Sequence, residues 1–179
     1  MQSETVSKRA THNNIKEIAV SGLFIAMVFI ATMFINIRLP ISINGGLIHL
    51  GNVVLFTVAI AFGKKYGAIA GAFGMGLFDI LSGWVAWAPF TFVIRGVMGF
   101  LIGSIANSKG RDGKSFLFNI LAIFIGSIWM VGGYYLTEVI LYGNWITPVT
   151  SIPGNIAQLV IGLIALILVP AIKRLNIKL

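Results

Sequence analysis

Residues 89–106 read PFTFVIRGVMGFLIGSIA, an apolar run whose only charge is Arg95. Two more isolated charges, Asp79 and Glu138, lie in other apolar stretches, whereas nearly every other charge falls in the polar joints between such stretches. An arginine near the middle of a spanning helix costs about 2.5 to 3.5 kcal/mol on insertion scales, so it persists where it faces a partner, a cavity or water. The pattern predicts a membrane protein with a polar cavity.

The composition of the whole chain agrees with this prediction. Of its 179 residues, 58% are hydrophobic and 10% are charged, far from the balance of an average soluble domain. A crossing needs about 20 apolar residues, so roughly six crossings use up most of the chain. We therefore expect one all-α domain over residues 1–179, an integral membrane bundle with a polar tail at 1–15 and spans at about 16–37, 50–63, 66–84, 89–106, 116–142 and 153–172.

Lysine and arginine predict the orientation, because positive charge resists translocation. Eleven of them lie in the tail, the second and fourth joints and the C-terminus, against Arg38 alone in the other joints. Both termini are therefore expected in the cytoplasm, and the chain in the plasma membrane. The polar start favours a cytoplasmic tail over a cleaved signal peptide. The formal charge of +8 then reflects contact with anionic lipid head groups rather than nucleic acid.

The isolated charges are expected at a similar depth, in the outer half of the membrane. A helix rises about 1.5 Å per residue, which places Arg95 roughly 9 Å below the outer end of its span. Aromatic and amide side chains converge on this level, and a flat ring held between tryptophans, with an amide and a charge at its edge, is typical of a small heteroaromatic ligand. The candidate binding residues are Arg95, Glu138, Asn155, Gln158, Trp84, Trp87, Tyr134, Trp145 and His49.

Structural roles are the alternatives for these residues. Asp79 and Arg95 could neutralise each other as an ion pair, and Glu138 could lie in the membrane interface. The tryptophans could form an ordinary aromatic belt. The two amides share a helix face and could bond neighbouring backbone. His49 could cap or support the first loop.

Small residues in the first span give a separate signal. Ala19, Gly22 and Ala26 form a strip that permits close approach of another helix. A similar strip in the third span is interpreted as internal packing. The chain has no nucleotide-binding motif, so it needs a partner if it is to be driven.

Nothing in the sequence indicates an enzyme. There is no HExxH motif, no P-loop and no plausible triad. The chain has no cysteine, and its two histidines are not at metal-ligand spacing. We expect no catalytic activity, no metal and no cofactor bound by this chain.

Three motifs in a fixed order carry a resemblance to a known family: IHLGN at 48–52, FGKKYGA at 62–68 leading to Asp79, and PFT at 89–91 followed by Arg95. They resemble the substrate-binding S components of energy-coupling factor (ECF) vitamin transporters, over nearly the whole chain. The resemblance implies capture of a vitamin near the outer surface, under the first loop and among spans four to six. It also implies a transmembrane coupling subunit and two ATPase subunits that use ATP.

The resemblance assigns the first-span strip to the coupling subunit, with Gly22 in place of the more usual alanine. Members assigned to hydroxymethylpyrimidine or pyridoxine look most similar. The pyrimidine's ring nitrogens and amine suit Glu138, Asn155 and Gln158, whereas the phenolic oxygen of pyridoxine suits Arg95. Pantothenate, which bears a carboxylate, would suit Arg95 better still and stays open as a substrate.

Two readings from other classes also stay open. The chain could be a stand-alone secondary transporter or channel, with Asp79 and Arg95 on an ion path. It could also be an assembly subunit whose polar residues only join helices.

Overall fold

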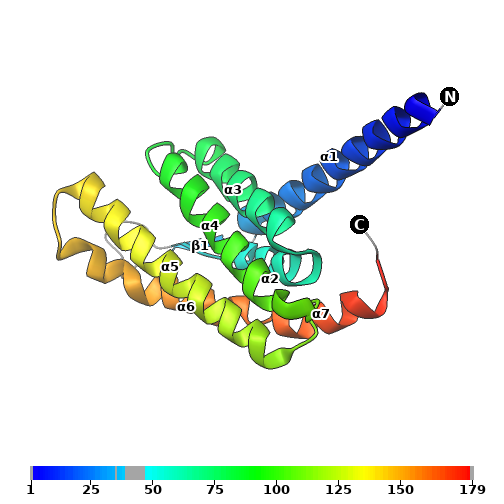
Figure 1. Ribbon diagram of the computed structural model, residues 1–179. Coiled ribbons are helices and arrows are strands. Elements are labelled where there is room, and N and C mark those ends of the chain that lie inside the picture. Colours follow the sequence, from blue (N-terminus) through cyan, green and yellow to red (C-terminus); the bar gives the residue numbers. More distant parts are fainter. Residues whose placement is uncertain (1, 35, 39–46, 178–179) are drawn as a thin grey trace.

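The computed structural model describes residues 2–34, 36–38 and 47–177, and these are almost entirely helical (Figure 1). The helices are α1 (Gln2–Phe34), α2 (Gly51–Phe62), α3 (Lys64–Leu81), α4 (Ala88–Ala106), α5 (Phe116–Tyr142), α6 (Ile152–Gly162) and α7 (Ala165–Arg174). Two short 3-10 helices, η1 (Ser108–Gly110) and η2 (Thr147–Ser151), lie beside α5 in the sequence. The expected all-α class is confirmed for this part of the chain.

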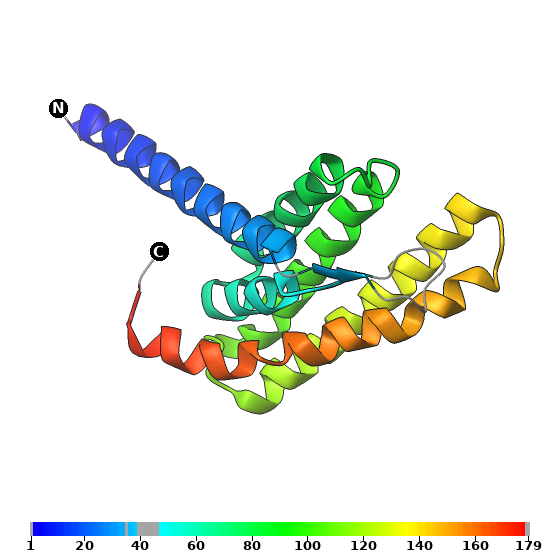
Figure 2. The same cartoon turned by 180° about the vertical axis from the view of Figure 1, so that it is seen from behind.

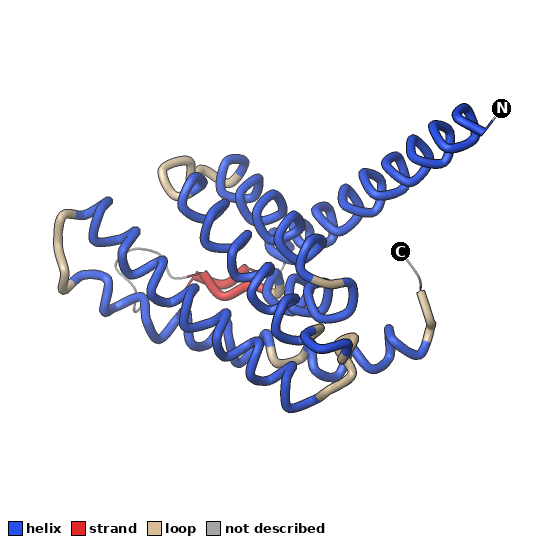
Figure 3. Tube along the Cα trace, in the orientation of Figure 1, coloured by secondary structure: helices blue, strands red, loops and turns tan. Residues whose placement is uncertain are grey.

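A small antiparallel hairpin is the one departure from the all-helical plan among the described residues. Strand β1 (Asn36–Arg38) pairs with β2 (Leu47–His49), with Ile37 opposite Ile48. Figure 3 shows the hairpin lying among the helices, and Figure 2 shows it beside α6. The sequence predicted a first span as far as residue 37 and a loop from there to His49, so the strand conformation of Asn36 and Ile37 corrects the end of that span.

Helix boundaries differ from the expected ranges at both ends of the chain. The backbone of α1 is helical from Gln2, so the expected tail continues the first span, and its N-terminal part stands clear of the other helices (Figures 1 and 2). The last span is divided into α6 and α7. At the junction Ile164 N–H donates to Ile161 O at 3.1 Å and Leu166 N–H to Leu163 O at 2.9 Å, which is 3-10 spacing.

Among the residues that the structure describes, four segments are long and apolar enough to cross a membrane: Asn14–Phe34, Ala88–Ala106, Phe116–Tyr142 and Thr147–Arg174. Helix α2 has only 12 residues and lies at the centre of the bundle (Figure 1). Apart from Asn52 and Thr57 its sequence GNVVLFTVAIAF is apolar, and Leu55, Phe56 and Ile60 are fully buried. A helix of this kind belongs in a core, because it has no polar face to offer to solvent.

Glycines bring α3 and α4 into backbone contact. A Cβ atom at Gly71 would lie 2.6 Å from the carbonyl oxygen of Arg95, and a Cβ atom at Gly99 would collide with the carbonyl oxygen of Gly67. The interpretation of the third-span strip as internal packing is confirmed. This contact fixes the backbone that carries Arg95 against α3.

Gly99→Ala is expected to destabilise the bundle by about 1 to 3 kcal/mol, the usual cost of overpacking a close contact. The matched control is Gly132→Ala on α5, where an added Cβ meets nothing within 4 Å. The control should unfold no earlier than the wild type, since alanine is the better helix former. Thermal unfolding in detergent measures both changes. Equal midpoints for the two variants would contradict this account of the α3–α4 contact.

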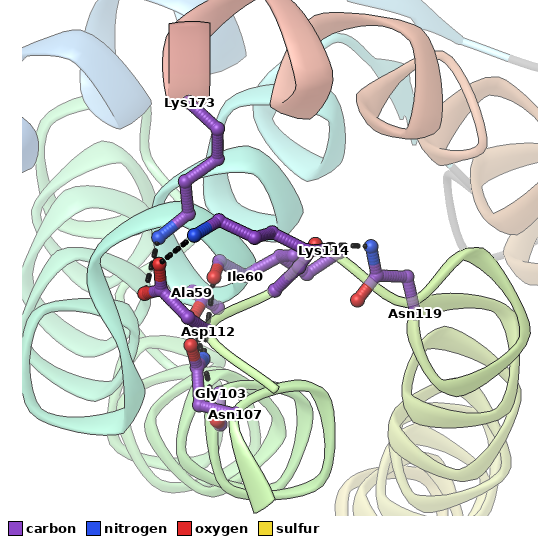
Figure 4. A network of polar contacts seen from close by, with 9 residues as sticks. Ala59, Ile60, Gly103, Asn107, Asp112, Lys114, Asn119 and Lys173 are labelled. Atoms are coloured by element: carbon purple, nitrogen blue, oxygen red, sulfur yellow. Dashed lines mark hydrogen bonds and ion pairs between the residues drawn. The ribbon is translucent and has the colours of Figure 1, made fainter. Parts of the chain in front are cut away.

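Polar contacts tie the joint between α4 and α5 to its neighbours (Figure 4). Asp112 accepts from Lys173 of α7 at 2.7 Å and pairs with Lys114 at 3.3 Å. The hydrogen bond from Lys173 is the main cause that holds the pKa of Asp112 below its usual value. Asn107 Nδ2 donates to Gly103 O at 2.9 Å and to Ile60 O at 3.2 Å, which joins the end of α4 to α2. The opposite end of α4 carries the candidate site.

Candidate ligand-binding site

A cavity lies between the helices at the N-terminal end of α4. It contains about 600 Å³ of space not filled by atoms, part of which is open to solvent. The C-terminal part of α3, the following loop, β2 and the inner faces of α4, α5 and α6 line it. Eight of the nine predicted binding residues are among its walls: Arg95, Glu138, Asn155, Gln158, Trp84, Trp87, Tyr134 and His49.

Helix periodicity explains why these residues meet. Trp87, which directly precedes α4, and Thr91 and Arg95 on α4 are each four residues apart and lie on one side of the helix. Tyr134 and Glu138 repeat this spacing on α5. The turn before α4 is held by Trp84 N–H, which donates to Asp79 O at 2.7 Å. Each element therefore presents a polar or aromatic side chain once per turn to the same space.

Arg95 is held in the cavity wall by several hydrogen bonds and is only 3% exposed. Its Nε donates to the Tyr134 hydroxyl at 3.0 Å. Its Nη1 donates to Asn52 Oδ1 at 2.6 Å, and its Nη2 to Gln158 Oε1 at 3.2 Å. The guanidinium thus joins α2, α4, α5 and α6. Arg95 therefore has a helix-joining role, which was one of the structural alternatives to ligand binding, and it also lines the cavity.

Asp79 lines the same cavity as Arg95 but makes no ion pair with it. Thr91, also in the cavity wall, has its Oγ1 3.0 Å from the Tyr134 hydroxyl. The ion pairs found among residues 14–34 and 47–177 do not include Asp79 or Arg95. The alternative of a direct Asp79–Arg95 ion pair is therefore not observed, and both groups line the cavity.

The hairpin is tied to the same network. Gln158 Nε2 donates to the carbonyl oxygen of Leu47 in β2. His49 Nδ1 accepts from Gly51 N–H at 3.2 Å, which caps the start of α2. A ring nitrogen that accepts carries no proton, so the neutral imidazole keeps its proton on Nε2. His49 supports the loop, as one interpretation of the sequence had it, and also faces the cavity.

Glu138 and the amides of α6 form the remaining polar wall. Ser151 Oγ donates to Glu138 Oε2 at 2.8 Å, which links α5 to the start of α6. Asn155 is half-buried and makes no hydrogen bond with the described residues. Its amide is therefore left to face the cavity with both a donor and an acceptor.

The aromatic wall contains two of the three predicted tryptophans. The Trp87 ring lies 6.4 Å from Trp84 and 6.3 Å from Tyr134, between centroids. The third, Trp145, is 64% exposed and does not line the cavity. Tyr135 binds the backbone carbonyl of Trp145 at 2.7 Å in the loop after α5, and this loop leaves the indole outside.

Sequence reasoning missed Asn52, which is fully buried and bonds both Arg95 and Gln158. It is the only amide in α2. A single amide in an otherwise apolar core helix is a signal that could have identified it. Thr91 and Ser151 were also missed, because short hydroxyl side chains are common in spanning helices.

The first-span strip lies apart from the cavity. Ala19, Gly22 and Ala26 are all exposed on α1, and an added Cβ at Gly22 would meet nothing within 4 Å. Their spacing keeps them on one side of the helix. Nothing in the described part of the chain covers this surface.

Apolar helices of spanning length around a polar, aromatic-walled cavity are typical of a helical membrane protein. A family comparison identifies the group more closely. The model of the family "ECF-type riboflavin transporter, S component" matches residues 12–174. The chain belongs to this family, which is one of transporter components and not of enzymes.

Two relatives extend the comparison. The chain is 29% identical over 171 residues to the thiamine precursor transporter HmpT of Lactococcus lactis subsp. cremoris, and the match covers 95% of each protein. It is 34% identical over 137 residues to an uncharacterized protein of Pyrococcus woesei, covering 76% of this chain and 87% of the relative. The suspected resemblance to ECF S components is confirmed.

Proposed function

We propose that this chain captures hydroxymethylpyrimidine, or the related ring of pyridoxine, in the cavity around Arg95. The observation that carries the proposal is one cavity in which Arg95, Asn155 and two carboxylate side chains face an aromatic wall. The name of the Lactococcus relative, a thiamine precursor transporter, agrees with a pyrimidine. The family description names riboflavin instead, so relatives of this chain differ in their substrates. The cavity must therefore be tested against hydroxymethylpyrimidine and against riboflavin.

The cavity offers a complementary group to each part of an aminopyrimidine. The flat ring can lie against Trp87 and Tyr134, since aromatic pairs prefer offset or edge contacts. The exocyclic amine is a donor, and Asp79 and Glu138 supply carboxylate acceptors. The ring nitrogens are acceptors, and Arg95 and Asn155 supply N–H donors.

The proposal includes the rest of the transporter. The chain would cross the plasma membrane six times with both termini in the cytoplasm, as the distribution of lysine and arginine predicts. It would deliver its ligand inward together with a transmembrane coupling subunit and two ATPase subunits. ATP would be used by those subunits, and this chain would bind no cofactor.

Isothermal titration of the purified chain in detergent tests the proposal. The panel is hydroxymethylpyrimidine, pyridoxine, pantothenate and riboflavin. We expect hydroxymethylpyrimidine to bind with micromolar or tighter affinity and to change the fluorescence of Trp84 and Trp87. Pantothenate should bind more weakly, because its carboxylate would face Asp79 and Glu138 as well as Arg95. Failure of every compound at micromolar concentration would reject the proposal.

Other outcomes separate the alternatives. Micromolar binding of riboflavin alone would replace the substrate and keep the S-component function. Uptake that persists in cells without the ATPase subunits would favour a stand-alone secondary transporter.

A further inference from the structure

The groups that directly contact the buried charge of Arg95 are neutral. Three oxygen acceptors contact it, from Tyr134, Asn52 and Gln158, at 3.0, 2.6 and 3.2 Å, and the Met130 sulfur lies 2.9 Å from Nη1. No carboxylate among residues 14–34 and 47–177 forms an ion pair with it. A buried charge usually has a counter-ion, because desolvation is costly without one. Here neutral dipoles make the direct contacts with the guanidinium.

The donor count leaves Arg95 one N–H for the cavity. A guanidinium has five N–H donors: one on Nε and two on each Nη. Tyr134 takes the Nε donor, Asn52 and Met130 take the two of Nη1, and Gln158 takes one of Nη2. The second Nη2 donor has no acceptor among the described residues. Since Arg95 lines the cavity, its positive charge and this donor are available to a ligand.

Asn52 fixes this arrangement because it both accepts and donates. Its Oδ1 accepts from Arg95, and its Nδ2 donates to Gln158 Oε1 at 3.3 Å and to Gln158 O at 3.4 Å. The three side chains therefore close a ring of hydrogen bonds. An ionised aspartate at this position could only accept, and it would also neutralise the guanidinium.

We propose that Asn52 is a positioning residue that keeps Arg95 fixed and unneutralised, so that the ligand supplies a hydrogen-bond acceptor to the free Nη2 donor. The acceptor is a ring nitrogen or an oxygen at the edge of a flat heteroaromatic compound. This inference rests on the proposed function. It adds that Asn52 acts on binding through Arg95 and needs no contact with the ligand.

A double-mutant cycle tests the inference, with the dissociation constant of hydroxymethylpyrimidine as the readout. The variants are Asn52→Asp, Arg95→Met and the two combined. The matched control is Asn119→Asp, which makes the same chemical change at a buried asparagine of α5 outside the cavity. If Asn52→Asp does not give monodisperse protein, Asn52→Ser takes its place in the same cycle.

We expect Asn52→Asp to weaken binding about tenfold or more, because the new carboxylate would pair with the guanidinium and weaken its hydrogen bond to the ligand. Asn119→Asp should leave the dissociation constant within about twofold of the wild type. In the Arg95→Met background, Asn52→Asp should have almost no further effect, because the residue through which it acts is absent.

Two results would overturn the inference while the proposed function stands. The first is wild-type affinity in Asn52→Asp, and the second is full additivity of the two single changes. Absence of binding by the wild type would instead reject the proposed function, and the inference with it.

Discussion

Arg95→Ala is expected to weaken binding of hydroxymethylpyrimidine by roughly 30-fold or more. Truncating one member of a buried, hydrogen-bonded charge network costs about 2 to 5 kcal/mol, much of it from partners left unpaired. Here Asn52, Tyr134 and Gln158 would each lose a donor. Titration calorimetry on the purified chain gives the change directly.

The control for this prediction is Arg111→Ala. Arg111 lies outside the cavity, with its guanidinium 3.5 Å from the centre of the Phe118 ring, and donates to Ser108 O at 2.9 Å. Its removal should not change the dissociation constant. Both variants must elute as monodisperse protein, so that a loss of binding is not a loss of fold. Undiminished binding by Arg95→Ala would show that the guanidinium does not serve the ligand.

Gly22→Trp is expected to abolish uptake in cells that contain the whole transporter and to leave ligand binding by the isolated chain unchanged. Gly22 is exposed between Ala19 and Ala26, and small residues at such a surface let two helix backbones approach closely. An indole at the centre of this strip would hold a partner helix away. It would not reach the cavity, which receives Thr32 from α1 but none of these three residues.

Parallel measurements of uptake and of the dissociation constant check this separation. Ile128→Trp is the control, because Ile128 is exposed on α5 and outside the strip. It should preserve both activities. If Gly22→Trp and Arg95→Ala lost binding to the same extent, the proposed division between a partner surface and a ligand cavity would be wrong.

Periodicity and depth made much of the site predictable. Charges isolated in apolar runs must find a polar environment, so Arg95, Asp79 and Glu138 pointed to a shared cavity before its walls were known. The four-residue spacing on α5 agrees with this, since it puts Glu138 one turn from Tyr134. The same argument predicted the helical class, because apolar runs of this length have few other structures in a membrane.

The remaining features depend on tertiary contacts that periodicity does not contain. In the sequence, Asn52 lies near the start of a short predicted span. Its role depends on the hydrogen bond from Arg95 of α4, which is 43 residues further along the chain. The break between α6 and α7 occurs at Gly162, where an added Cβ would collide with the Phe56 ring of α2. Trp145 was assigned to the site only because it is an aromatic residue in the loop after α5. The conformation of that loop leaves its side chain exposed.

The most direct test of a ligand cavity around Arg95 is a structure determined with hydroxymethylpyrimidine bound. We predict density for a flat ring between Trp87 and the Arg95–Gln158 pair, with an acceptor atom of the ring within hydrogen-bond distance of Arg95 Nη2. Density for the compound at any other place, with the space around Arg95 closed by side chains, would contradict the account.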